Sequence, residues 1–563
     1  MFATDLQAII EQVELLLAGE ELSERVEEAV GKLLNAVEAL AADKRLLAEE
    51  VGRLRKQLEQ KKQAKTTGGK GIGDAGGEPL PPKSNHSSEA HRKNISDPDQ
   101  PRRKGLDRRT FKALTIHDTQ ECPVDPATLP PDAVRFADET VIVQDLIIKP
   151  HNIRFLQQVY YSAAENRYYR GPLPAGYDQG DYSGNLRALI IALKYCGNMS
   201  EPKIGQFLEN FEIQVSSGSL SNILTNTAKQ FEPDYHDVLM AGLASTSYQQ
   251  TDDTSARVGG RFWHTHILCN PYYTFYSTQP RKDRLTVLAM LQNTQDLWFR
   301  FGAEALQLLC DEFLDVPDKW QPRLAALGEV VLSADQLKRL LDSWFEGGNQ
   351  QLRAAIEQAT AINYYRHQTA VPVVRTLVCD DAGQFKLLTP RLALCWIHEG
   401  RHYEKLSPVA ASHTRALTGF QTRYWQYYKA LQDYRAGPTP EKAAKLRVEF
   451  DDLFSSRTGY DLLDDRIAKT QAKREELLVV LSDPTVPLHN NASELGARVS
   501  ARRRDVSLHS RSPRGAHAMD IFTTLVQTCA KLGQSAYEYL RARICGESQP
   551  PALRQLILSR ASG

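Results

Sequence analysis

The N-terminal segment carries a seven-residue repeat of apolar side chains. Leucine occupies one position of each repeat, at Leu33, Leu40, Leu47 and Leu54. Valine occupies the alternating position at Val30, Val37 and Val51, and Lys44 stands once in that row. Leucine at d with β-branched valine at a favours a parallel two-stranded coiled coil. We therefore predict a dimerising coiled-coil helix in residues 1–61, with a single amphipathic helix packed on its own domain as the alternative.

The hydrophobic pattern changes three times after this helix. Residues 62–116 are rich in Gly, Pro, Ser and charge and lack an apolar period, which predicts a disordered basic linker. Residues 117–182 contain the alternating runs TVIVQDLIIKP and RFLQQVYYS, which predict a small β module. Residues 183–240 return to helical spacing and predict a helix-turn-helix-like pair, with Ser216 or Ser217 starting the second helix. A plain helical hairpin explains that pattern as well.

Strand patterns and helical patterns share the rest of the chain. The runs TSYQQTDDT, RFWHTHILC and YYTFYST predict a strand that ends in acids, followed by a hairpin. The apolar run VPVVRTLVC predicts a buried strand before a second pair of acids, and RLALC predicts another strand leading into a helix. These patterns predict a multidomain, mostly α protein with an α/β core. The core spans 241–284 and 366–510, helical insertions span 285–365 and 405–485, and a helical segment ends the chain at 511–563.

Composition narrows the protein class. The chain has 563 residues, with 69 basic and 69 acidic side chains, so overall charge favours no nucleic-acid or membrane partner. The eight cysteines form no C-x-x-C pair, which is typical of a reduced compartment. The acidic N-terminus does not resemble a signal peptide, and no apolar run reaches the roughly 18 residues of a membrane span. We expect a cytoplasmic protein without a membrane partner.

Three acidic sites stand out against this background. Asp252 and Asp253 close one predicted strand, and Asp380 and Asp381 close another. Glu494 lies one turn into a helix that starts at Asn490 or Asn491, where asparagine is a common N-cap. Carboxylates gathered from two strand ends and a helix are the ligands that Mg²⁺ prefers, and a pair of such ions can catalyse phosphodiester displacement. Each acid alone is more often an ordinary surface residue, so the joint pattern carries the prediction.

The residues around these acids resemble one known family. TDDTSARVGG, LVCDDAGQF with LCWIHEGRHYEKL, and the block HNNASELGARVSARRRDVSLHSRSPRG are similar to segments of insertion-sequence DDE transposases of the IS66 family. The resemblance covers most of residues 180–545. It implies a ribonuclease-H-like catalytic core, cutting of transposon ends and joining of the 3′-hydroxyl to target DNA. The catalytic and metal-binding acids it implies are Asp252, one of Asp380 and Asp381, and Glu494, holding two Mg²⁺ or Mn²⁺ ions. Asn490, Asn491, Cys395 and His398 are expected to support them.

The chain departs from the family pattern in three places. His489 stands where the family usually has an acid. The family usually carries a cysteine-based zinc ribbon upstream, but here only Cys122 remains, so zinc is not expected there. The long gap between Asp252 and Asp380 indicates an inserted helical segment. The first departure keeps open the alternative of a catalytically inactive, transposase-derived DNA-binding dimer.

Arginines follow the third acid closely. They are Arg498, Arg502, Arg503, Arg504, Arg511 and Arg514. Arginine binds phosphate oxygens bidentately, and phosphate contacts position DNA on a protein. We predict that these side chains bind DNA beside the metal site, with a solvated basic face as the alternative.

A second motif offers a different enzyme. His398, Glu399 and His402 match H-E-x-x-H, which on a helix places both histidines on one face and can bind zinc with the glutamate as general base. The match is short, and no third ligand follows at a familiar spacing. A zinc metalloprotease is therefore the less favoured alternative.

Overall fold

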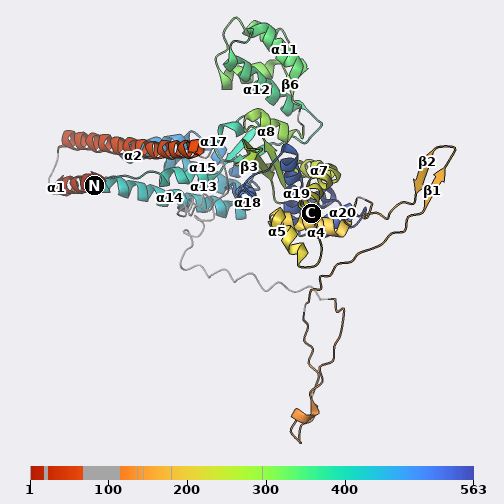
Figure 1. Cartoon of the computed structure of the whole chain (residues 1–563). Helices are drawn as coiled ribbons and strands as arrows, with labels where there is room; N and C mark the ends of the chain where they lie inside the picture. Colours follow the sequence, from red (N-terminus) through yellow and green to blue (C-terminus); the bar gives the residue numbers. More distant parts are fainter. Residues whose placement is uncertain are drawn as a thin grey trace.

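The computed structural model is mostly helical and is built around one mixed sheet (Figure 1). It describes residues 2–17, 23–66, 115–135, 137–143, 145–178, 180–294 and 296–562. Most of the predicted linker at 62–116 lies outside these residues. Among the described helices, none is long and apolar enough to cross a membrane.

The central sheet has five strands in the order β5-β4-β3-β8-β9. They are β3 (Tyr248–Val258), β4 (Arg261–Cys269), β5 (Thr274–Gln279), β8 (Thr376–Cys379) and β9 (Arg391–Leu394). β3, β4 and β5 pair antiparallel, whereas β8 runs parallel to both β3 and β9. The predicted strands are confirmed, with one correction. β3 does not end at its acids but continues to Val258, because its polar second half pairs with the start of β4.

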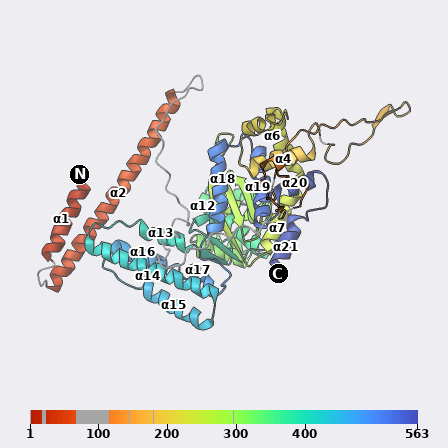
Figure 2. The ribbon, with the colours of Figure 1, turned by 90° about the horizontal axis from the view of Figure 1, so that it is seen from below.

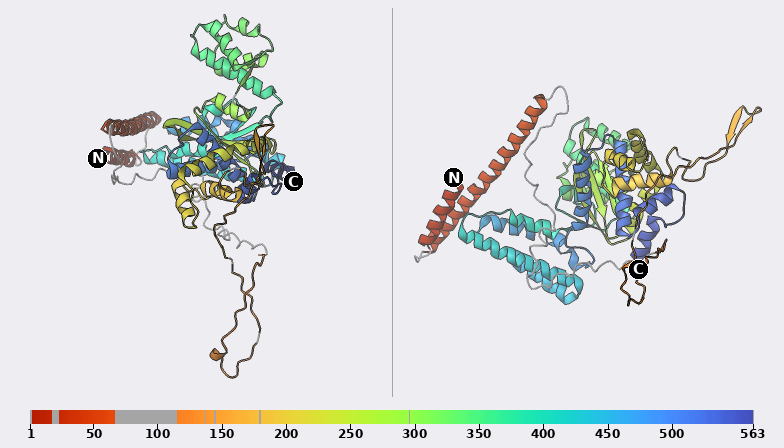
Figure 3. Two further views of the ribbon diagram at one scale, coloured as in Figure 1. Left: turned by 45° about the vertical axis from the view of Figure 1, so that its right-hand side comes forward. Right: turned by 60° about the horizontal axis from the view of Figure 1, so that its bottom comes forward.

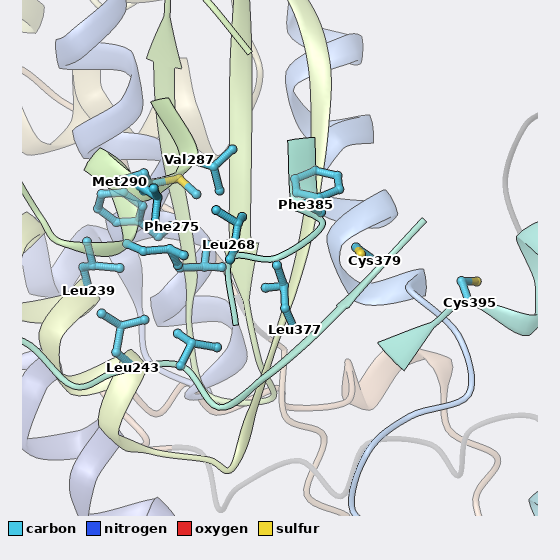
Figure 4. Close-up of a cluster of buried hydrophobic side chains, with 14 of the residues drawn as sticks. Leu239, Leu243, Leu268, Phe275, Val287, Met290, Leu377, Cys379, Phe385 and Cys395 are labelled. Atoms are coloured by element: carbon cyan, nitrogen blue, oxygen red, sulfur yellow. The ribbon is translucent and has the colours of Figure 1, made fainter. Parts of the chain in front are cut away.

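Each face of this sheet packs against different helices. Leu268 and Phe275 are paired neighbours on one face and pack with the helices α7 (Glu232–Ala244) and α8 (Arg284–Leu291), as Figure 4 shows. Their neighbours Ile267 and Tyr276 point to the other face, toward α18 (Asn491–Ser507). Gly496 permits a close approach there, since a Cβ at this position would lie 2.8 Å from Ile267 Cγ2. Side chains of β3 therefore alternate between these two faces: Gln249 donates to the Gly242 oxygen of α7, and Asp252 shares the α18 face with its partner Ile267.

Two groups of helices interrupt the strands, as predicted. The first group forms a lobe set apart from the sheet (Figures 1 and 3). It contains α9 (Ala303–Leu308), α10 (Gln321–Ala325), α11 (Ala334–Phe345) and α12 (Gln350–His367). The second group follows α13 (Trp396–Glu404) and contains α14 (Ala411–Ala436), α15 (Pro440–Phe454), α16 (Asp461–Gln471) and α17 (Arg474–Leu477). The first segment is not helical throughout, because the short strands β6 (Trp298–Arg300) and β7 (Val331–Ser333) pair within it.

The C-terminal segment is helical, as predicted. Its helices are α19 (Pro513–Lys531), α20 (Ala536–Ile544) and α21 (Leu553–Ser562). In Figure 2, α18 and α19 lie beside the sheet. Helix α19 packs on the edge strand β5, where the Thr524 hydroxyl accepts a hydrogen bond from the Tyr276 backbone N–H at 3.0 Å.

The N-terminal helices are α1 (Phe2–Leu17) and the long α2 (Glu24–Thr66). They dock on the start of α14 through two acids: Glu38 accepts from the Ala410 backbone N–H at 2.9 Å, and Glu14 accepts from that of Ala411 at 2.9 Å. The repeated leucines Leu33, Leu40, Leu47 and Leu54 remain 51–69% exposed. The helix is thus present and its leucine row is uncovered in the single chain, while the coiled-coil pairing stays a prediction.

The segment before the core differs most from the expectation. In the described part of this segment, the predicted strands are reduced to one hairpin, β1 (Val159–Ser162) with β2 (Arg167–Arg170), on an extended arm (Figure 1). The run from 140 to 150 is irregular in its described residues, and its apolar side chains there remain 39–81% exposed. Downstream lie α4 (Gly184–Tyr195), α5 (Glu201–Glu209) and α6 (Ser217–Asn226). Ser216 caps α6 as predicted, whereas a DNA-reading role of this helix pair stays a prediction.

Candidate active site

Strand register brings Asp252 and Asp380 together. Gln250 of β3 pairs with Val378 of β8 in parallel, and each aspartate lies two residues further along its chain. Since side chains alternate with a period of two, both aspartates belong to the same face of the sheet. Ile267, the β4 partner of Asp252, faces α18, so this is the face that α18 covers.

Helix α18 brings Glu494 to the same face. Glu494 lies in its first turn, and the helix packs on β3 and β4. The Asn490 side chain donates to the Thr251 backbone oxygen at 2.7 Å, which fastens the start of α18 next to Asp252. Asn490 occupies the N-cap position but its side chain does not cap the helix, so the capping expectation is wrong in that detail. Its side-chain oxygen instead accepts from the Ser493 hydroxyl at 2.5 Å.

The neighbouring aspartates, Asp381 and Asp253, form ion pairs with lysine side chains. Asp381 contacts Lys386 at 2.8 Å and Lys473 at 2.7 Å. Although burial alone would raise it, these two ammonium groups hold the pKa of the Asp381 carboxyl below its usual value. Asp253 lies 3.6 Å from Lys282 and accepts from the Gln384 side chain at 2.8 Å. Each aspartate pair therefore divides into one member paired with lysine and one that faces the acidic site.

The carboxylates of the site repel one another unless a cation lies between them. Burial, reinforced by the nearby carboxylates of Asp380 and Glu494, raises the pKa of Asp252 to about 8. Burial also raises the pKa of Asp380. Desolvation and like charge both disfavour the ionised form, and a bound cation would relieve both. The carboxylate set therefore suits a hard divalent cation such as Mg²⁺.

Cys395 and His398 lie against the third acid. Cys395 directly follows β9, and its sulfur accepts from the Asn490 backbone N–H at 3.3 Å. His398 Nε2 is 3.6 Å from Glu494 Oε1, and burial lowers the pKa of His398 to about 4. Within the described residues, one set of three His, Cys, Asp or Glu side chains has its ligand atoms all within 4.8 Å of one another: Cys395, His398 and Glu494. The three carboxylates are more widely spaced than that.

The glutamate of the H-E-x-x-H match, Glu399, is held in a buried cluster of ion pairs and hydrogen bonds. Glu399 is only 3% exposed and is bonded by Arg466, by the Thr470 hydroxyl at 2.6 Å and by Lys473 at 3.1 Å. A carboxylate held in this way is not available as a general base for water. His402 does not join His398 in the ligand set found among the described residues. The geometry gives no support to the protease alternative.

His489 lies one residue before the N-cap of α18. Its ring Nδ1 accepts from the Asn491 backbone N–H at 3.4 Å, at the first residue of α18. A neutral imidazole nitrogen accepts a hydrogen bond as a carboxylate oxygen does. The departure from the family pattern therefore keeps an acceptor at the start of the helix that carries Glu494.

The predicted DNA-contacting arginines have different surroundings. Arg502, Arg511 and Arg514 are exposed, whereas Arg498 and Arg504 are partly buried. Arg504 donates to the Thr254 hydroxyl at 3.1 Å, and Arg514 donates to Asn226. Arg503 is a correction, because it is 7% exposed and binds the Tyr195 backbone oxygen at 3.1 Å and the Thr523 hydroxyl. It stabilises the packing of α18 and cannot reach DNA in this fold.

The sequence did not reveal that Lys386 and Lys473 pair with Asp381 and thereby distinguish it from Asp380. Lys473 lies between α16 and α17, far from Asp381 along the chain, so no local spacing links the two residues. The burial of Arg503 did carry a signal. It follows Gly496 by seven residues, which places both on the inward stripe of the helix.

Comparison with known proteins identifies the family of the chain. The model of the family described as "Transposase IS66 family" matches residues 337–518, which contain Asp380, Cys395, His398 and Glu494. A protein of Sinorhizobium fredii, described as the uncharacterized protein y4jO, is 32% identical over 333 residues. That alignment covers 58% of this chain and 100% of the relative. The chain belongs to the IS66 family of transposases.

Proposed function

We propose that the protein is a DNA transposase that cuts transposon ends and joins the freed 3′-hydroxyl to target DNA. The observation that supports this most directly is that three partly buried acids, from β3, the end of β8 and α18, lie on one face of the sheet. The arrangement fits the ribonuclease-H-like core that the family resemblance implies. Asp380 is the better candidate for the second acid, because Asp381 is already paired with Lys386 and Lys473.

The wider spacing of the three acids suits two ions better than one. Ions about 4 Å apart, each with ligand oxygens about 2 Å away, keep the outer carboxylates apart and let one acid lie between both. Asp252 is the central acid, since the charges of both Asp380 and Glu494 act on it. When bound, two Mg²⁺ or Mn²⁺ ions would activate the attacking oxygen and stabilise the leaving oxygen. Asn490 supports this arrangement of acids, because its hydrogen bond to Thr251 joins α18 to β3.

The DNA strand must also be positioned by contacts other than those to the metal ions. Glu494, Arg498 and Arg502 are spaced four residues apart on α18, so they form one stripe of the helix that starts at the acidic site. Arginines along such a stripe would contact successive phosphates and place one of them over the metal ions. Arg511 and Arg514, which are exposed after the end of α18, are further candidates for phosphate contacts.

The proposal includes a second copy of the chain. The exposed leucine row of α2 is the pattern of a parallel dimeric coiled coil, and pairing would cover it. A dimer would present two active sites, one for each transposon end.

The deciding experiment uses the full chain and DNA that carries the element's terminal inverted repeats. We expect cleavage and 3′-end joining with Mg²⁺ or Mn²⁺, and loss of both in Asp252→Asn. Specific DNA binding by a folded parent protein without any metal-dependent cleavage would instead identify the inactive DNA-binding dimer. A variant that cleaves as well as the parent would remove Asp252 from the site.

A further inference from the structure

Three side chains with three different donor atoms meet beside the acidic site. The Cys395 sulfur, a His398 ring nitrogen and a Glu494 carboxylate oxygen lie within 4.8 Å of one another. The distance from His398 Nε2 to Glu494 Oε1 is 3.6 Å. Nitrogen and oxygen ligands about 2.0–2.1 Å from a tetrahedral zinc ion are separated by about 3.3–3.5 Å. The His398–Glu494 pair therefore has nearly the spacing of two corners of a tetrahedral metal site, and the Cys395 sulfur lies within 4.8 Å of both.

The main chain holds these ligands in place. The Cys395 backbone N–H donates to the Cys379 oxygen at 3.0 Å, which extends the pairing of β9 with β8 to the ligand itself. The Trp396 backbone N–H donates to the Leu488 oxygen at 3.0 Å, and the Asn490 N–H donates to the Cys395 sulfur at 3.3 Å. Strand β9, helix α13 and the start of α18 are thus joined directly. A site assembled from fixed elements needs little rearrangement to bind an ion.

The donor atoms indicate the kind of ion. Sulfur and imidazole ligands favour zinc and similar transition metals, whereas Mg²⁺ takes oxygen ligands. An N–H group directed at a metal-bound sulfur is a common support of such sites. Cys395 and His398 are therefore poor ligands for Mg²⁺, although they lie directly beside its predicted site.

We propose that Cys395, His398 and Glu494 bind a transition-metal ion, with Zn²⁺ as the best fit, separately from the two catalytic ions. On binding, the Cys395 thiol releases its proton to solvent and its sulfur donates an electron pair to the ion, with no change of oxidation state. Because Glu494 belongs to both sets, the ion withdraws it from the catalytic Mg²⁺ and inhibits DNA cleavage. Only this inhibitory consequence rests on the proposed function.

Cobalt substitution tests the binding directly. We expect the metal-free full chain to bind one equivalent of Co²⁺ with a thiolate-to-cobalt charge-transfer band in the near ultraviolet. Cys395→Ala abolishes the band, and His398→Gln, which removes a ligand, weakens binding by at least about tenfold. Cys379→Ala is the matched control, since Cys379 is also buried and its backbone oxygen accepts from the Cys395 N–H (Figure 4 labels both residues). The site is overturned if the parent shows no band, or if the band survives in folded Cys395→Ala.

Zinc inhibition tests the consequence. We expect Zn²⁺ to inhibit Mg²⁺-dependent cleavage by the parent, and we expect the half-inhibiting Zn²⁺ concentration to rise at least about tenfold in Cys395→Ala relative to Cys379→Ala. Equal inhibition of both variants would overturn the shared role of Glu494. If no form of the protein cleaves DNA, the proposed function fails, while the cobalt band still decides whether the metal site exists.

Discussion

The Asn490 side chain donates a hydrogen bond to the Thr251 backbone oxygen at 2.7 Å and thereby joins the helix of Glu494 to the strand of Asp252. Since residues that orient metal ligands typically affect metal affinity or activity by about 10–100-fold, Asn490→Ala should lower the cleavage rate by that factor. It should also raise the Mg²⁺ concentration needed for half-maximal rate. If Asn490 has only a structural role, Asn490→Ala should lower the melting temperature, and the Mg²⁺ dependence of cleavage by the folded protein should be unchanged.

The two aspartates at the end of β8 should behave differently. Asp380→Asn should lower the cleavage rate by about 10²–10³-fold or more, because it removes a charge that faces the reaction site. Asp381→Asn should retain catalysis but lower stability, since Lys473 would lose one of its two acidic partners. Cleavage rates and thermal unfolding of both variants separate these effects. Full activity of Asp380→Asn together with an inactive Asp381→Asn would exchange the two assignments.

Local sequence patterns reveal the elements of this site but not their pairing. The apolar run before Asp380 and the helix around Glu494 are visible in sequence, because burial and helical spacing leave local signatures. The parallel register of Gln250 with Val378 is non-local and has no such signature. The choice between Asp380 and Asp381 depends on Lys473, which a helical group far along the chain supplies.

Two errors have equally physical causes. Alternating apolar residues at 140–150 predicted a strand, yet a strand needs a partner, and the described residues there remain exposed. The closeness of Arg503 to Glu494 predicts a DNA contact, but Arg503 is buried, and its helical position points inward with Gly496. Composition alone does not show which face of a helix a residue occupies.

Metal binding should depend on pH through Asp252. Its pKa is about 8 in the fold and about 3.9 in an unfolded chain, so the metal-free fold binds the extra proton between these values. Stability of the metal-free protein should therefore fall as pH rises through this window, and Mg²⁺ should restore it most strongly at the upper end. Melting temperatures from about pH 5 to 8, with and without Mg²⁺, test this expectation. Asp252→Asn should flatten both trends, and an unchanged pH profile would contradict the raised pKa.

Neighbouring arginines on α18 should separate DNA binding from stability. Arg502→Ala should weaken binding to all DNA sequences and reduce the slope of log affinity against log salt by about 1, because one phosphate contact is lost. Arg503→Ala should instead lower the free energy of unfolding by about 1–3 kcal/mol, since Tyr195 and Thr523 lose a buried partner. Salt titrations of DNA affinity and denaturant unfolding of both variants provide the comparison. A reduced salt slope in folded Arg503→Ala would show that its burial is not maintained on DNA.

Adjacent leucines on α2 provide a matched test of the dimer. Leu47 belongs to the seven-residue row and Leu46 does not, yet they are 66% and 64% exposed in the single chain. A charge in the seam of a coiled coil loses its water on pairing, so Leu47→Glu should convert the dimer to a monomer, whereas Leu46→Glu should leave it dimeric. Light scattering on the full-length variants measures this directly. If the parent is already monomeric, or if both substitutions dissociate it equally, the leucine row is not the dimer interface.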